Sequence, residues 1–154
     1  MITKTRLSYI ILFLLVNYSL KAQNDDSKAV LESATDFVTA FNNFDWTTFQ
    51  ESFTDDATIF YPFWKQAKRV KGRNKIDNVW TTIFPEFVDS ENTRKLQISP
   101  KDINIQIYQK TAIVTFHLGS GENKLSRRTL VMVKEKEKWK IAHLHASNLK
   151  KNTN

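Results

Sequence analysis

The apolar residues of this chain follow two different periods, one in each half. Up to about residue 88 they recur three and four residues apart, which is the spacing of one face of a helix. From about residue 96 apolar and polar residues alternate, and residues two apart on a strand point to the same face of a sheet. Helices followed by a run of neighbouring strands indicate the α+β class. No internal repeat or linker divides the pattern, so we expect one domain.

Three helices are predicted in the first half. An amphipathic pattern covers residues 26–42, and Asp45 can cap a second, shorter helix. A third helix, the most apolar, should end or kink near Phe84 because Pro85 removes a backbone donor and clashes with the preceding turn. Residues 57–61 are rich in strand formers and predict one strand between the second and third helices.

The second half predicts strands joined by short turns. The joints are short enough for antiparallel hairpins, which favours a meander. Five segments have the required alternation: 96–99, 103–108, 112–118, 125–134 and 139–147.

The first 22 residues are typical of a secretory signal peptide. Lys4 and Arg6 precede an apolar run over residues 7–20, and Ala22 is a small residue suited to a cleavage site. The run is shorter than the roughly 20 residues of a membrane-spanning helix, which favours cleavage over an uncleaved anchor. We therefore expect a domain over residues 23–154 that is secreted or periplasmic and leaves the membrane after cleavage.

Charge and cysteine content exclude several functional classes. The formal net charge of +7 includes three basic residues of the signal segment, and the remaining charges are scattered through loops and turns. A nucleic-acid partner is not expected, because such proteins carry a basic stripe on one face. The chain has no cysteine, which excludes thiol catalysis and thiolate metal sites.

The last predicted strand places two histidines two residues apart. Because residues two apart share a face, one face carries an apolar start and a titratable end, made of Trp139, Ile141, His143, His145 and Ser147. This face is predicted to turn inward, towards the helices. By the same reasoning Arg127 is the better pocket candidate of its strand, and His117 is expected at the surface or an interface.

Aromatic residues from the first half are expected to meet these strands. Tyr61, Trp64, Trp80 and Phe84 are interpreted as part of the core and as a lining for a ligand. The predicted ligand pocket is the set Tyr61, Trp64, Trp80, Phe84, Arg127, His143 and His145.

Several blocks of the sequence carry a family resemblance. They are residues 41–46 before the second helix, residues 53–58 after it, Gly72 before the third helix, and residues 139–147. In this order they resemble the SnoaL-like branch of the nuclear transport factor 2-like superfamily. The last block is also similar to the end of the association domain of calcium/calmodulin-dependent kinase.

The resemblance implies an α+β cone, the nuclear transport factor 2-like or cystatin-like roll. A curved antiparallel sheet would pack on the three N-terminal helices around a pocket, and two copies would pair as a homodimer. Members of the superfamily include polyketide cyclases, ketosteroid isomerases, dehydratases, and binding or assembly modules, so the fold alone does not settle function.

Enzymes of this fold resemble one another in using a pocket carboxylate as base. Here the central strands carry no internal Asp or Glu, while Asp45, Asp55 and Asp56 are explained as caps and turn formers. The leading prediction is therefore binding of a small apolar or aromatic molecule.

Two alternatives remain open. One is an isomerase, cyclase or hydratase type of enzyme with His145 or His143 as the catalytic group, since imidazole titrates near neutrality. The other is a homo-oligomeric assembly module without a ligand. No cofactor is expected, and no metal, because the two histidines lack an evident third ligand.

Overall fold

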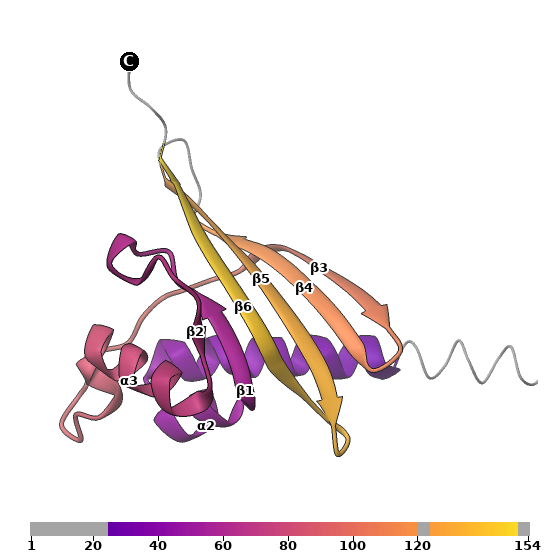
Figure 1. The fold of residues 1–154 in the computed structure, drawn as a ribbon, viewed down its shortest axis with the longest axis horizontal. Coiled ribbons are helices and arrows are strands. Elements are labelled where there is room, and N and C mark those ends of the chain that lie inside the picture. Colours follow the sequence, from indigo (N-terminus) through magenta and orange to yellow (C-terminus); the bar gives the residue numbers. More distant parts are fainter. Residues whose placement is uncertain (1–24, 120–123, 151–154) are drawn as a thin grey trace, which may run out of the picture.

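The computed structural model describes residues 25–119 and 124–150. Within these ranges the chain forms three α-helices and one six-stranded sheet with the strand order β2-β1-β6-β5-β4-β3 (Figure 1). None of the helices in this part is both long enough and apolar enough to cross a membrane. The predicted signal peptide, residues 1–22, lies outside the described residues.

The three helices, β1 and the last four strands follow the predicted order, and η1, β2 and η2 are additional. The first helix covers residues 25–43 and is followed by α2 (Trp46–Glu51), β1 (Phe53–Phe60), the short 3-10 helix η1 (Trp64–Gln66), β2 (Val70–Lys71), α3 (Arg73–Ile83), the short 3-10 helix η2 (Pro85–Phe87), β3 (Lys101–Tyr108), β4 (Thr111–Leu118), β5 (Lys124–Glu135) and β6 (Lys138–Lys150).

The last four strands form the predicted antiparallel meander. Lys136 and Glu137 both have positive φ, 47° and 66°, as the tight turn between β5 and β6 requires. The sheet is nevertheless mixed, because β1 lies beside β6 and runs parallel to it. The meander is predicted from the short turns between consecutive strands. Such turns carry no information about the pairing of β1 with β6, which lie far apart in the sequence.

The predicted strand over residues 96–99 is wrong. This segment is irregular and is held by the end of the first helix. The Ile98 N–H donates to Asn42 Oδ1 at 2.8 Å, and Asn42 Nδ2 donates to the Ile98 carbonyl at 2.9 Å. The Leu96 N–H donates to the Asn42 carbonyl at 2.8 Å. The amide side chain thus supplies the hydrogen bonds that a neighbouring strand would have supplied.

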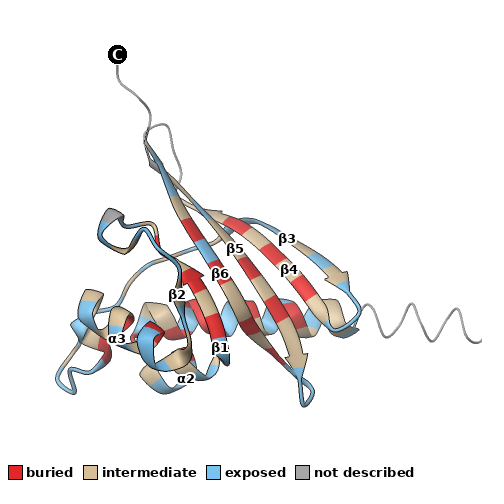
Figure 2. Cartoon of the chain, viewed as in Figure 1, coloured by how far each residue is buried: buried red, intermediate tan, exposed pale blue. Residues whose placement is uncertain are grey.

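The core lies between the helices and the concave face of the sheet. Buried residues alternate with less buried ones along β4 and β5, as Figure 2 shows. Ala112 and Val114 on β4 face the core beside Leu130 and Met132 on β5. On the helical side Phe49 is 1% exposed and is surrounded by aromatic rings, including Phe87 at 4.7 Å between centroids.

A β-bulge interrupts β6 and reverses its alternation. Ile141 pairs with Met132 and His143 pairs with Val131, so Ala142 is the additional residue. Trp139 and Ile141 are buried before the bulge, and Leu144 and Ala146 are buried after it. The prediction that His143, His145 and Ser147 face the helices is therefore wrong. An extra residue moves every later side chain of the strand to the opposite face.

Candidate ligand pocket

An apolar cavity of about 250 Å³ lies between the concave face of the sheet and the helices. Its wall combines the first helix, the segment after β1, the third helix, the irregular segment before β3, and three central strands. The lining residues are Phe37, Val38, Phe41, Tyr61, Pro62, Phe63, Trp80, Phe84, Leu96, Ile98, Phe116, Leu118, Arg128, Leu144 and Ala146.

The end of α3 supplies the aromatic side of the wall. The Phe84 N–H makes the last helical bond, to the Trp80 carbonyl at 2.8 Å, and Pro85 then starts η2, so the predicted helix end is confirmed. The rings of Trp80 and Phe84 are stacked, with centroids 5.7 Å apart. Phe41 of the first helix contacts both edge-on, at 5.3 and 5.1 Å.

The polar atoms of Tyr61 and Trp80 are buried. The Tyr61 hydroxyl donates a long hydrogen bond of 3.5 Å to the Ile76 carbonyl. Burial raises the pKa of Tyr61, with a smaller contribution from Asp77, so the hydroxyl keeps its proton. The indole Nε1 of Trp80 is buried and has no hydrogen-bond partner among the described residues.

Among the described residues that line the cavity, Arg128 carries the one charged side chain. It lies on β5 between Phe116 of β4 and Ala146 of β6, and burial lowers the pKa of its guanidinium. Its Nη1 donates to Ser126 Oγ at 2.6 Å and to the Arg127 carbonyl at 2.9 Å.

The prediction that Arg127 lines the pocket is wrong, because its neighbour Arg128 lies there instead. Arg127 is exposed on the outer face, where it pairs with His117 of β4 and Ser147 of β6. The sequence of β4 contains the signal that could have identified Arg128. Every second residue from Ala112 to Leu118 is apolar, which marks the inward face, and Arg128 is paired with Phe116 of that face. His117 lies on the outer face, as predicted.

The two other histidines also lie outside the cavity. The Nδ1 of His143 is 2.7 Å from Thr58 Oγ1, and the ring of Phe60 lies 5.8 Å from each of the rings of His143 and His145. Burial lowers the pKa of His143, and the nearby His145 and Arg69 lower it further. These groups form a cluster on the outer face where β1 and β6 run side by side.

The predicted pocket residues are thus only partly brought together. Tyr61, Trp80 and Phe84 line the cavity, whereas Arg127 and the two histidines do not. Trp64 begins η1, and its side chain lies outside the described part of the structure.

The wall offers few groups for acid–base chemistry. No Asp, Glu or His is among the described residues that line the cavity. In the same part of the chain no three His, Asp or Glu side chains gather closely enough to hold a metal ion. The described wall is a largely apolar space with one guanidinium, which is an arrangement suited to binding.

Comparison with known proteins agrees with this architecture. The profile of the SnoaL-like domain family matches residues 30–150. No functionally curated protein is significantly similar to the chain in sequence.

Solved structures share the fold at low sequence identity. A proposed dehydratase of the NTF2-like family from Streptomyces avermitilis is 19% identical, with a TM-score of 0.67 over 82% of this chain and 98% of that chain. The CaMKII hub of S. rosetta is 26% identical, with a TM-score of 0.61 over 79% and 95% of the two chains. A proposed ketosteroid isomerase from Shewanella frigidimarina is 22% identical, with a TM-score of 0.59 over 75% and 92%. With the family match, the mixed curved sheet and the three helices, the chain belongs to the SnoaL-like domain family and has the α+β cone fold of the NTF2-like superfamily.

Proposed function

We propose that this protein binds a small, largely apolar or aromatic molecule in the cavity. The observation that carries the proposal is the cavity wall, in which the aromatic rings of Phe41, Trp80 and Phe84 face the apolar inward residues of the sheet. The volume of about 250 Å³ equals that of about eight water molecules at ~30 Å³ each. Such a space fits a ligand with one or two rings.

Binding is favoured over catalysis by the chemistry of the wall. An isomerase, cyclase or hydratase needs a group that moves a proton at the reacting carbon. His143 and His145, the candidates for that role, lie on the outer face of the sheet. The proposed dehydratase and the proposed ketosteroid isomerase share the fold with this chain at or below 22% identity, which gives no reason to assign their reactions here.

A neutral aromatic probe tests the binding proposal. We expect 1-naphthol to bind the purified protein, and Ala146→Leu to weaken binding by about tenfold or more because the new methyl groups occupy the cavity. Ala67→Leu is the matched control, because Ala67 is exposed and does not line the cavity. Equal affinity in both variants, measured by titration calorimetry, would contradict the proposal. Native mass spectrometry of the protein from its own host would identify a co-purifying ligand.

We also propose that two copies pair through the outer face of the sheet. The helices lie on the concave side of the sheet (Figure 1). The outer face presents half-buried Ile113 and Val131, which are paired across β4 and β5. Burying such side chains against a second copy is favourable, at roughly 25 cal/mol per Å² of apolar surface. The structural similarity to a CaMKII hub supports an assembly role for this fold.

Light scattering coupled to gel filtration tests this pairing. Val131→Glu should convert a dimer to a monomer, because it places a charge at the centre of the face. Val88→Glu makes the same change at a residue that is 65% exposed and lies after η2, outside the sheet, and should leave the mass unchanged. A monomeric unmodified protein would refute the pairing.

Export is a separate proposal, based on residues 1–22. Expression of the full chain in a bacterium with two membranes should release a periplasmic protein whose N-terminal sequence starts at Gln23. A form without residues 2–22 should stay in the cytoplasm. An uncleaved, membrane-bound product would contradict the proposal.

A further inference from the structure

Arg128 occupies an unusual position for a cation. Its backbone is in the middle of the sheet, and the residues paired with it on both sides are apolar, Phe116 and Ala146. Both neighbours line the cavity together with Arg128. A charge next to apolar surface loses hydration, and this loss is recovered only when an opposite charge or suitable acceptors are nearby.

The guanidinium is held in place by hydrogen bonds from one of its nitrogens, Nη1. Nη1 donates to both Ser126 Oγ and the Arg127 carbonyl, and Ser126 Oγ in turn donates to Asn148 Oδ1 at 2.5 Å. A guanidinium carries five N–H groups in a planar fork, and the bonds found within the described residues use only Nη1. Among the described residues the N–H groups of Nη2 and Nε have no acceptor, so they can donate to a ligand.

The two other polar side chains of the described wall, those of Tyr61 and Trp80, carry no charge. The indole Nε1 of Trp80 is buried away from the open space of the cavity. The hydroxyl of Tyr61 keeps its proton and donates a hydrogen bond to the Ile76 carbonyl. Within the described part of the wall, the Arg128 guanidinium is therefore the polar group that a ligand can meet, and it calls for acceptors and negative charge.

We propose that the ligand of this cavity is an amphipathic carboxylic acid, bound as its anion, with the carboxylate on Arg128 and the apolar body between Phe41, Trp80 and Phe84. This inference rests on the proposed binding function and specifies its ligand class. A single arginine compensates a single carboxylate and matches its planar geometry. A phosphate ester carries nearly two charges at neutral pH and would need additional cations, which the described part of the wall does not supply.

A pair of probes of nearly the same shape separates the two proposals. 2-Naphthoate and 2-naphthamide share the ring system and differ in the negative charge. We expect the unmodified protein to bind 2-naphthoate about tenfold more tightly than 2-naphthamide, because a charge-assisted pair in an apolar site adds about that factor to affinity. Arg128→Gln should remove this preference and leave the affinity for 2-naphthamide unchanged.

The adjacent arginine provides the control. Arg127→Gln changes the net charge of the protein by the same amount but alters an exposed residue of the outer face, so the preference for 2-naphthoate should persist. Arg128→Lys keeps the charge without the fork and should retain a reduced preference, which tests the inference even if Arg128→Gln does not fold.

The outcomes are distinct. Equal binding of the two probes by the unmodified protein overturns the carboxylate inference while the binding function stands. A preference that survives Arg128→Gln, or that Arg127→Gln removes equally, also overturns it. If neither probe binds, the binding function and the inference fall together.

Discussion

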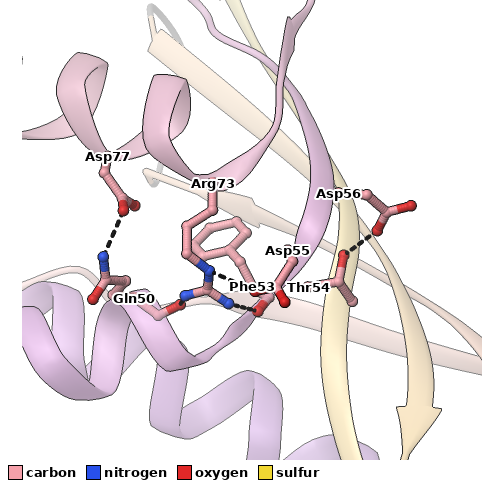
Figure 3. Close-up of polar contacts among 7 residues, drawn as sticks. All are labelled: Gln50, Phe53, Thr54, Asp55, Asp56, Arg73 and Asp77. Carbon is pink, nitrogen blue, oxygen red and sulfur yellow. Dashed lines mark hydrogen bonds and ion pairs between the residues drawn. The ribbon is translucent and has the colours of Figure 1, made fainter.

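The side chain of Arg73 connects α3 to α2 and β1 by hydrogen bonds. Arg73 is the first residue of α3, and its guanidinium reaches three acceptors (Figure 3). Nη1 donates to the Gln50 carbonyl at 2.6 Å, Nη2 donates to the Phe53 carbonyl at 2.5 Å, and Nε donates to Asp55 Oδ1 at 3.0 Å. We predict that Arg73→Ala destabilises the fold mainly through the two backbone carbonyls.

The expected magnitude follows from the burial of each acceptor. Hydrogen bonds from a charged group contribute about 1.5–3 kcal/mol, with the lower end appropriate to the part-buried carbonyls of Gln50 and Phe53. The side chain of Asp55 is 95% exposed, and an exposed ion pair contributes at most ~1 kcal/mol. A cation at the positive N-terminal end of α3 is unfavourable, so its removal offsets the loss of stability by about 0.3–1 kcal/mol. The sum predicts a loss of about 2–4 kcal/mol for Arg73→Ala.

Urea unfolding of matched variants measures these contributions. Asp55→Ala should cost less than ~1 kcal/mol, and Lys75→Ala, at an exposed position of the same helix, should cost almost nothing. The loss for Arg73→Ala corresponds to a drop of roughly 10 °C in the melting temperature of a domain of this size. If Asp55→Ala proved as damaging as Arg73→Ala, the ion pair and not the carbonyl contacts would hold the helix, and the reasoning would fail.

Three further predictions concern other contacts of the fold. The pKa of His143 is lowered from its usual 6.5 in the folded state, so the unfolded chain binds a proton more readily, and stability should fall as the pH drops below about 6.5. His143→Gln should flatten that dependence in melting curves, and an unchanged slope would contradict it. Phe49→Ala should cost about 3–5 kcal/mol in urea unfolding, because it removes a ring that is 1% exposed. Asn42→Ala should cost about 1–3 kcal/mol and speed proteolysis near Ile98, whereas exposed Asn43→Ala should change neither.

Local signals in the sequence predicted the helix boundaries well. Asp45 accepts a hydrogen bond from the Thr48 N–H at 3.1 Å and caps α2, as expected of its residue type. Pro85 ends α3 for the stereochemical reason that predicted it. Such signals operate within a few residues and need no knowledge of the tertiary structure.

Strand faces were predicted less well, because a β-bulge changes the alternation of apolar residues without any residue type that marks it. The buried apolar residues of β6 occupy odd positions up to Ile141 and even positions from Leu144 onward. That change of parity is the sequence signature of the bulge at Ala142, and a strictly alternating interpretation overlooks it. The same assumption placed His143 and His145 in the pocket.

The bulge also leads to a prediction about how binding depends on pH. All three histidines lie on the outer face, and among the described residues the cavity is lined by no group that titrates near neutrality. Arg128 stays protonated throughout this range, and Tyr61 keeps its proton because burial raises its pKa. The affinity for 2-naphthoate should therefore be constant between about pH 6 and 8, in which range the carboxylate remains ionised. Affinity that fell as the pH rose from 6 to 8, and became constant in His143→Gln, would show that this histidine acts on the cavity and that the bulge does not isolate it.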